Sequence, residues 1–339
     1  MTEFKLIAMD TSKHVFTLHG LDAGGRTVLR LELTRAKVEA FFEKLLPTEV
    51  VLEACGGSHH WGRRLAALGH SVRLLPPQYV KPFVKRGKND RIDAEAIAEA
   101  ALRPNINPVP VKSAETQAQT MVLSVRELLV KQRTQLVNAL RGHATEFGLI
   151  AAKGPCNVAR LLENIAADPA VPACAQAMFV ELGEAIAAVS ARVKELDREL
   201  GRQHRSNPIS QHLAEVPGIG PVGALTLALT IDPKQFRSAR HFAAWLGLTP
   251  KEHSTGGKQR LGGISRQGNE RLRQLLVLGA TSVVKVANPG RKNTSTWLLE
   301  LLARKPRKLV AVALANKMAR IVWAMMTSGE AYRPQPVAA

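Results

Sequence analysis

Short apolar runs and stretches of helical periodicity follow one another in a fixed order over residues 1–110, and this order constrains the fold most. Three apolar runs come first, with turn glycines before the third, and helical stretches then separate two further runs. The predicted strands are 4–9, 15–18, 28–33, 50–52 and 70–75. The resulting order, βββαβαβα, predicts a mixed α/β domain over residues 1–110.

Four acidic residues stand where this order would gather them. Asp10 and Glu53 each follow an apolar strand, at the sheet rim where sites in α/β folds collect. Asp90 and Asp93 begin an alanine-rich helical stretch and share one helix face, about 4.5 Å apart along its axis. Taken singly, the first two are also typical of strand ends and the last two of a helix N-terminus. Together, four mutually repulsive carboxylates predict a site for Mg²⁺, or Mn²⁺, and metal-assisted phosphodiester chemistry.

The chain is strongly basic, with a formal net charge of +19 from 47 Lys and Arg against 28 Asp and Glu. A polyanion is the simplest partner for such a charge, although the charge could also serve solubility alone. Aromatic residues make up only 4% of the sequence, so we expect phosphate contacts rather than base stacking to carry nucleic-acid affinity. The candidate phosphate ligands just before and within the acidic helix are Lys85, Arg86, Lys88 and Arg91.

Cysteines and apolar runs indicate the compartment. The three cysteines have no CxxC or Cys–His spacing, which argues against a disulfide framework or structural zinc and fits a reducing compartment. No uninterrupted apolar run nears the roughly 20 residues of a membrane span, and residues 1–13 lack the apolar centre of a signal peptide. We therefore expect a soluble, cytoplasmic protein without a membrane partner.

Two long stretches of the middle region, residues 111–207, repeat apolar residues at spacings of three and four. The first seam is Val122, Val125, Leu129, Leu136 and Ala139, and the second is Leu182, Ile186, Val189, Val193, Leu196 and Leu200. A segment with Gly and Pro between 148 and 172 can reverse the chain, so the seams predict an antiparallel helical coiled-coil arm. The seams either pair only with each other or also bind a second subunit, because two short helices bury little surface alone.

Residues 208–332 are expected to form a mainly helical domain with two glycine-rich segments. In the first, Pro217-Gly218-Ile219-Gly220 looks like the turn of a helix-hairpin-helix. Gly218 and Gly220 would let a phosphate approach the backbone N–H groups at the next helix start. A plain tight connection between two packed helices is the alternative. From Gly329 on the chain is expected to fray, with 333–339 as a flexible tail.

The second glycine-rich segment, residues 253–263, is polar, basic and too long for a simple helix connector. Ser254 and Thr255 precede two glycines there, and a hydroxyl flanked by cations can serve as the nucleophile of a covalent phosphoryl intermediate. A flexible turn without function is the alternative. The nearby cations that could neutralise a phosphate are Lys258, Arg260 and Arg266.

Four segments resemble motifs of the insertion-sequence 110 family of transposases, particularly its 1111 subgroup. They are MDTSK at 9–13, VLEACGG at 51–57, KNDRIDAEAIAE at 88–99 and TPKEHSTGGKQRLGGISRQGN at 249–269, in the family's order. The resemblance implies a ribonuclease-H-like (RuvC-like) N-terminal domain, similar to that of Holliday-junction resolvases. The family's Asp-Glu-Asp-Asp tetrad then falls on Asp10, Glu53, Asp90 and Asp93.

In the resembled family, a serine of the last motif forms a phosphoserine link to DNA and completes a composite site with the metal-bound tetrad. Many relatives have Ser-Gly there, whereas this chain has Ser254 and Thr255 before glycine. Ser254, whose primary hydroxyl is less hindered, is the expected nucleophile, and Thr255 is the alternative. The resemblance further implies a structured guide RNA, and an assembly between dimer and tetramer.

Two other functions are compatible with these residues. A Holliday-junction-resolvase-like nuclease would use the same tetrad with water as the nucleophile and would leave no protein on the DNA. A non-catalytic nucleic-acid-binding protein would need neither the carboxylates nor the serine. The serine segment distinguishes a transposase, acting as a site-specific DNA recombinase, from both.

Overall fold

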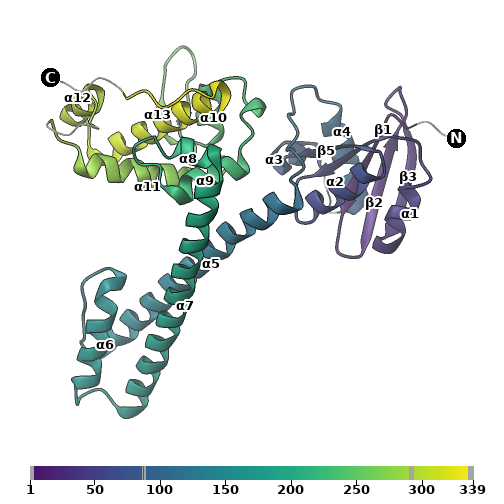
Figure 1. The fold of residues 1–339 in the computed structure, drawn as a ribbon. Helices are drawn as coiled ribbons and strands as arrows, with labels where there is room; N and C mark the ends of the chain where they lie inside the picture. Colours follow the sequence, from purple (N-terminus) through teal and green to yellow (C-terminus); the bar gives the residue numbers. More distant parts are fainter. Residues whose placement is uncertain (1–3, 86, 88, 290–293, 335–339) are drawn as a thin grey trace. The chain divides into compact units, whose positions relative to one another are not determined.

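The computed structural model describes residues 4–85, 87, 89–289 and 294–334. The chain forms two compact units, Met1–Gln117 (unit 1) and Ala118–Ala339 (unit 2) (Figure 1). Each unit has its own apolar core. The finer division expected at 110/111 and 207/208, with three domains and a tail, stays a prediction.

Unit 1 is built around one five-stranded sheet whose strands lie in the order β3-β2-β1-β4-β5. The first three strands pair antiparallel as a meander, whereas β4 joins β1, and β5 joins β4, in parallel. The strands are β1 (Leu6–Thr11), β2 (Val15–Leu21), β3 (Thr27–Thr34), β4 (Glu49–Glu53) and β5 (Ser71–Leu75). This mixed sheet confirms the expected α/β class and fits a ribonuclease-H-like domain.

Alternation of side chains along β1 creates an apolar layer on each face of the sheet. Leu6 and Ala8 pack against α4, whereas Ile7 and Met9 pack against α1 and α2. The helices of unit 1 are α1 (Val38–Phe42), α2 (Ser58–Ala67), α3 (Pro77–Val80) and α4 (Asp90–Ala101). The helix that the sequence predicts between the third and fourth strands is short, because a 3-10 turn at Arg35–Lys37 precedes it. The alanines of α4 let this helix lie close to the sheet, which fixes its N-terminus near the strand ends.

In unit 2, three helices form an arm whose apolar residues face one another. Figure 1 shows α5 and α7 side by side, with the short α6 against them. They are α5 (Ala114–Glu146), which begins within unit 1, α6 (Val158–Ala167) and α7 (Ala173–Ser206). The buried positions of α7 recur every seven residues, at Phe179, Ile186, Val193 and Leu200, in line with the predicted second seam. Whether these helices supercoil stays a prediction.

The first seam lies one residue away from its expected position. Val125 is 40% exposed, whereas Leu123 and Val137 are buried. The seam is displaced because Arg126 occupies a half-buried position, where its guanidinium forms an ion pair with Asp197 of α7 (2.5 Å). A charged residue at a half-buried position thus interrupts the apolar pattern by which the sequence would indicate the packed face of the helix.

The remainder of unit 2 is mainly helical and shares one apolar core, in which Phe242, Leu276, Met318 and Val322 lie. Its helices are α8 (Pro208–Leu213), α9 (Pro221–Thr230), α10 (Ala239–Trp245), α11 (Glu270–Val286), α12 (Thr296–Arg304) and α13 (Arg307–Ser328). A short antiparallel hairpin of β6 (Pro250–Glu252) and β7 (Leu261–Ile264) interrupts them, which the sequence pattern did not predict.

The chain after α13 returns to the core instead of fraying from Gly329. The N–H of Tyr332 donates to the Glu215 carboxylate (3.1 Å), and the Tyr332 ring packs against the core. Of the predicted flexible tail, residues 335–339 lie outside the described residues.

Two helices, α7 and α13, are long and apolar enough to cross a membrane by length and composition alone, which is weak evidence. In both helices, apolar residues are buried within unit 2. Met318 and Val322 of α13 lie in the unit 2 core, and α7 carries the seam of the arm.

Candidate functional site

Two of the four acidic residues lie on neighbouring parallel strands. Met9 of β1 is paired with Leu52 of β4. Asp10 and Glu53 are the next residues on the two strands, so they lie beside each other at the strand ends. Both point to the face of the sheet that α4 covers, because they alternate with Ala8 and Val51, whose side chains pack against α4.

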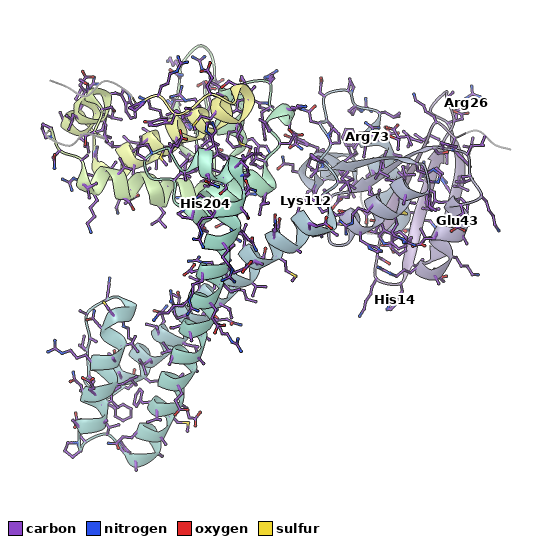
Figure 2. The ribbon with its side chains drawn as sticks, viewed as in Figure 1. His14, Arg26, Glu43, Arg73, Lys112 and His204 are labelled. Carbon is purple, nitrogen blue, oxygen red and sulfur yellow. The ribbon has the colours of Figure 1, made fainter. Side chains whose placement is uncertain are left out.

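The other two acids lie in the first turn of α4. The Asn89 side chain accepts the backbone N–H of Arg91 (3.0 Å) and caps the helix, which leaves Asp90 and Asp93 inside its first turn. At the opposite end of α4, Arg73 of β5, labelled in Figure 2, donates to the Ala101 carbonyl (3.1 Å). The helix is thus held to the sheet at its C-terminus and brings its acidic N-terminus to the strand ends.

The structure brings three of the predicted ligands into one group. One carboxylate oxygen each of Asp10, Asp90 and Asp93 lies within 4.8 Å of the others. Glu53 is outside this group, but its charge still acts on Asp10. All four positions are thus near one another, with Glu53 more distant than the sequence pattern suggests.

Burial and mutual repulsion change the proton affinity of this group. Burial, and then the charges of Asp93, Asp90 and Glu53 in that order, together raise the pKa of Asp10 from 3.8 to about 6. Burial, and then the charge of Asp93, also raise the pKa of Glu53. Crowded carboxylates of this kind are stabilised by a cation among them.

The donor set fits a hard divalent cation. It consists of carboxylate oxygens alone, and such ligands suit Mg²⁺, Mn²⁺ or Ca²⁺ rather than softer metals. Within the described ranges, no other group of three or more His, Cys, Asp or Glu side chains comes together in this way.

The basic residues before α4 are partly engaged within the protein. Lys85 forms an ion pair with Glu95 (2.7 Å), and Arg91 forms one with Glu32 (2.8 Å). The other two predicted phosphate ligands, Arg86 and Lys88, lie outside the described residues. At Lys85 and Arg91, a phosphate would therefore compete with a carboxylate that is already bound.

The segment with the candidate nucleophile is an ordered hairpin rather than a long flexible loop. Gly256 and Gly257 both have positive φ, of 56° and 74°, and the Lys258 N–H donates to the Thr255 carbonyl (3.0 Å). Two successive left-handed residues are typical of the tight turns that close β-hairpins. The turn therefore accounts for the two glycines. Ser254 and Thr255 lie directly before them, and both are exposed.

The two hydroxyls of this hairpin differ in their surroundings. The Ser254 hydroxyl donates to the Glu252 carboxylate (2.8 Å) and accepts the backbone N–H of Arg260 (3.1 Å). Among the described residues, the Thr255 hydroxyl has no hydrogen-bond partner. Both residues are exposed, as are Lys258 and Arg260 beside them.

A buried arginine supports the base of the hairpin. Arg273 of α11 is only 8% exposed and donates to the carbonyl oxygens of Leu246 (2.9 Å) and Gln267 (2.7 Å). Close by, exposed Arg266 has a φ of 57°, the only positive φ at a described residue other than glycine, and its N–H donates to Gly247 (3.2 Å). The sequence reading missed Arg273, whose only signal is its place in the apolar periodicity of α11.

The predicted helix-hairpin-helix turn connects α8 and α9, and its two glycines have different surroundings. Gly218 has a φ of 90° and lies against the backbone of Gly279 in α11, so packing requires it. Gly220 precedes α9, and a Cβ there would meet no atom within 4 Å. A groove of about 650 Å³ beside the turn is lined mainly by apolar residues, including Val222 and Leu278. The helix-hairpin-helix role stays a prediction.

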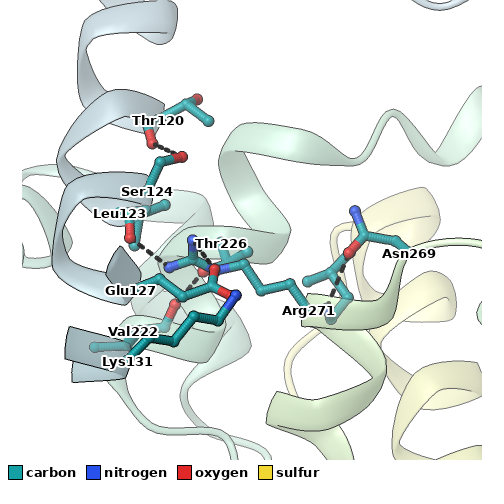
Figure 3. Close-up of polar contacts among 10 residues, drawn as sticks. Thr120, Leu123, Ser124, Glu127, Lys131, Val222, Thr226, Asn269 and Arg271 are labelled. Carbon is teal, nitrogen blue, oxygen red and sulfur yellow. Dashed lines mark hydrogen bonds and ion pairs between the residues drawn. The ribbon is translucent and has the colours of Figure 1, made fainter. Parts of the chain in front are cut away.

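A polar network joins α11 to the arm within unit 2 (Figure 3). Arg271 donates to the Glu127 carboxylate (2.7 Å) and to the Leu123 carbonyl (2.8 Å), and Lys131 forms a second ion pair with Glu127 (2.9 Å). The hydrogen bond from Lys131, and then the charge of Arg271, lower the pKa of Glu127. The helix that carries the support of the serine hairpin is therefore anchored on α5, which the sequence did not indicate.

Comparison with known proteins covers both units. The profile of the family described as "Transposase IS116/IS110/IS902 family" matches residues 210–295, which include Ser254, and a DEDD transposase profile matches residues 7–148, which include the four acids. The y4pF/y4sB protein of Sinorhizobium fredii is 55% identical over 96% of this chain and 85% of its own length. The transposase for insertion sequence element IS1111A of Coxiella burnetii is 36% identical over 98% and 92%, respectively. That for insertion sequence element IS1328 of Yersinia enterocolitica is 35% identical over 98% and 99%.

Proposed function

Because this chain belongs to the IS116/IS110/IS902 family of transposases, enzymes that cleave and rejoin DNA, we propose that it moves its own insertion sequence through a covalent serine–DNA intermediate. The observation that carries the proposal is the exposed Ser254 hydroxyl, held by a carboxylate and a backbone N–H on an ordered hairpin. A serine used only for a turn has no need of both partners.

The acidic group supplies the other half of the chemistry. The DEDD transposase family requires a divalent metal, and Asp10, Asp90 and Asp93 would hold it, with Glu53 as the fourth carboxylate. Mg²⁺ is the proposed ion, with Mn²⁺ able to replace it, because the ligands are all hard oxygens. When bound, such an ion polarises the scissile phosphate and stabilises negative charge on the leaving oxygen.

In the proposed reaction, the Ser254 oxygen attacks the phosphorus atom and forms a phosphoserine bond while the bond to the leaving strand oxygen breaks. A free strand hydroxyl then attacks the phosphoserine and releases the serine. The number of phosphodiester bonds is unchanged, so rejoining needs no nucleotide cofactor. Lys258 and Arg260, both exposed on the hairpin of Ser254, would neutralise the phosphate, and Arg266, at the base of the hairpin beside Gly247, would contact the DNA further along.

The partners follow from charge and from the nature of the reaction. A net charge of +19 suits both DNA and a structured guide RNA, and we propose that the chain binds both. Strand exchange needs several DNA ends held together, so we propose an assembly between dimer and tetramer. Such an enzyme would act in the cytoplasm, where the element's DNA lies.

The test uses radiolabelled DNA with the element's junction, RNA transcribed from the flanks of the gene, and Mg²⁺, followed by denaturing electrophoresis. We expect labelled DNA that migrates with protein, loss of this species in Ser254→Ala, and its persistence in Thr255→Ala, the matched control one residue away. EDTA should abolish it, and so should Asp10→Asn.

Each alternative has its own outcome. An adduct lost only in Thr255→Ala would transfer the nucleophile to that residue. Free cleaved DNA that neither substitution affects would establish a metal-dependent nuclease of the resolvase type and end the covalent proposal. Adducts formed equally well without RNA would remove the guide RNA from the proposal and leave the covalent chemistry intact.

A further inference from the structure

We infer that Glu252 is the general base that takes the proton of Ser254 when the serine attacks DNA. The inference rests on the proposed covalent function and names a catalytic residue for it. The observation behind the inference is the hydrogen bond that the Ser254 hydroxyl donates to the Glu252 carboxylate, with 2.8 Å between the two oxygens. A candidate base must lie within about 2.6–3.2 Å of the atom whose proton it takes, and Glu252 meets this condition before any substrate is bound.

The hairpin itself creates this contact. Glu252 ends β6 and Ser254 lies two residues further on, so the extended backbone directs both side chains to one side. From the opposite strand, the Arg260 N–H donates to the Ser254 oxygen (3.1 Å). The serine oxygen thus directs its proton at the carboxylate and one lone pair at the N–H. Its second lone pair remains for the attack on phosphorus.

The Glu252 carboxylate also has no cation of the described residues as an ion-pair partner. Glu95 and Glu127, by contrast, have lysines as partners, which lower their pKa and make them weaker bases. Within the described part of the chain, Glu252 forms no ion pair, and its side-chain partner is the serine hydroxyl. Its carboxylate is exposed, so a phosphate can reach the serine from solvent.

The charge that a carboxylate brings to a phosphate site has to be offset. Lys251, Lys258 and Arg260 lie on the same exposed hairpin and offer three cations against one anion. The hairpin as a whole therefore still attracts a phosphodiester, while the single carboxylate is held against the serine.

The proton balance of the step is closed. As the serine oxygen bonds to phosphorus, its proton moves to Glu252, and the leaving strand oxygen departs and takes a proton from water. When a strand hydroxyl later attacks the phosphoserine, that hydroxyl gives its proton to water, and protonated Glu252 returns its proton to the departing serine oxygen. Glu252 ends each cycle as it began, as a carboxylate.

This pairing also separates the two candidate nucleophiles. Thr255 has no carboxylate partner among the described residues, and its neighbour in the turn is glycine. Glu252 therefore supports Ser254 as the nucleophile on grounds other than steric access.

The experiment measures the rate of adduct formation with labelled junction DNA, RNA and Mg²⁺ in full-length variants. We expect Glu252→Gln, which keeps the size but cannot accept the proton, to slow the adduct by about 100- to 10,000-fold, the usual contribution of a general base. DNA affinity should stay within about two-fold of the wild type, because the substitution removes no cation. Glu300→Gln, an exposed acid of α12, is the matched control and should form adduct at the wild-type rate.

Chemical rescue tests the base role against a structural one. Glu252→Ala should be as slow as Glu252→Gln, and added formate or acetate should accelerate it in proportion to concentration, since a small carboxylate can take the vacated place. Ser254→Ala should not respond. Thermal unfolding of both Glu252 variants checks that the hairpin substitutions leave the fold intact, as expected for an exposed position.

The opposing outcomes are distinct. Adduct formation by Glu252→Gln at the wild-type rate, or a slow Glu252→Ala that formate does not accelerate, would overturn the base assignment and leave the covalent function standing. A wild-type protein that cleaves DNA without any adduct would overturn the proposed function, and the assignment of Glu252 with it.

Discussion

The carbonyl oxygen of Gly218 lies 1.9 Å from the point that a Cβ on Gly279 would occupy. The reverse approach is also close, because a Cβ on Gly218 would stand 2.8 Å from the Gly279 carbonyl oxygen. The turn before α9 and the middle of α11 therefore touch through their backbones, which a pair of glycines permits. Gly218, which the motif assigns to phosphate contact, is required for packing.

We expect Gly279→Ala to destabilise unit 2 by about 1–3 kcal/mol, the usual cost of overpacking, because the obstructing atom belongs to the backbone and cannot rotate away. Urea unfolding measures the change. Gly142→Ala in α5 is the matched control, since a Cβ there meets nothing within 4 Å, and alanine favours a helix interior by about 0.5–1 kcal/mol. Equal loss of stability in both variants would contradict the packing argument.

Gly220 separates packing from phosphate binding in the same turn. It has a φ of −83° and open space around it, so alanine fits without strain. If the N–H groups at the start of α9 bind a phosphate, a methyl group there hinders its approach. Gly220→Ala should then keep the wild-type unfolding midpoint and lose about five-fold in DNA affinity, roughly the 1 kcal/mol of one hydrogen bond. Unchanged affinity in fluorescence anisotropy would leave the turn a plain connection.

Asp10 gives the metal-free protein a specific dependence on pH. Its pKa is about 6 in the folded chain against an ordinary 3.8. Between pH 3.8 and 6, Asp10 is therefore mostly protonated in the folded chain and mostly ionised in the unfolded chain. The stability from this group is therefore fully present below about pH 3.8 and lost as the pH rises through 6. Asp10→Asn should be more stable than the wild type in EDTA at pH 7, by about 1–2 kcal/mol because the site is partly solvated, and equally stable below about pH 4.

Mg²⁺ should reverse this order at pH 7. The cation relieves the repulsion among the wild-type carboxylates, so it should raise the wild-type unfolding temperature and have little effect on Asp10→Asn. Scanning fluorimetry with and without Mg²⁺ measures both. Glu43→Gln, an exposed acid of unit 1 outside the acidic group, should follow the wild type throughout. A metal response retained by Asp10→Asn would remove Asp10 from the ligand set.

Most of unit 1 could be predicted because its strands alternate cleanly. Leu6 and Ala8 face one apolar layer, and Ile7 and Met9 face the other. Such alternation fixes which side chains point to which face of the sheet. The same regularity predicted that Asp10 would lie at a strand end. Sequence spacing could not predict that Glu53 lies outside the close group of the other three acids, since that depends on how β4 and α4 pack.

Elsewhere the decisive residues break the patterns that sequence reading relies on. The strand β6 has three residues, all exposed, so no alternation indicates it, and the Glu252–Ser254 contact depends on that strand. Arg273 is charged yet buried, because two backbone carbonyls replace its water. Arg126 shifts the apparent seam of α5 for a similar reason. In each case a tertiary partner outweighs the local preference.

The buried arginine leads to a further prediction. Arg273→Lys should lower the stability of unit 2 by about 1–3 kcal/mol, because a single nitrogen, Nη1, donates to both the Leu246 and Gln267 carbonyls and the lysine side chain ends one atom short of it. The loss should also loosen the base of the serine hairpin and slow adduct formation. Arg304→Lys, an exposed position near the end of α12, is the control for urea unfolding and for adduct rate. An Arg273→Lys protein with wild-type stability would contradict the role of the two carbonyls.

The Lys85–Glu95 ion pair allows a test of the predicted phosphate contact of Lys85. Glu95 competes with a phosphate for Lys85 through a 2.7 Å contact, so if Lys85 binds DNA, Glu95→Gln should raise DNA affinity by about two- to five-fold, the range of an exposed ion pair. Lys85→Ala should weaken binding and lower the slope of log affinity against log salt by about one. Fluorescence anisotropy from about 50 to 200 mM salt measures both. Glu43→Gln removes the same charge without releasing a cation, since Glu43 forms no ion pair with a described residue. An equal gain in Glu43→Gln and Glu95→Gln would mean that net charge, and not the freed lysine, sets the affinity.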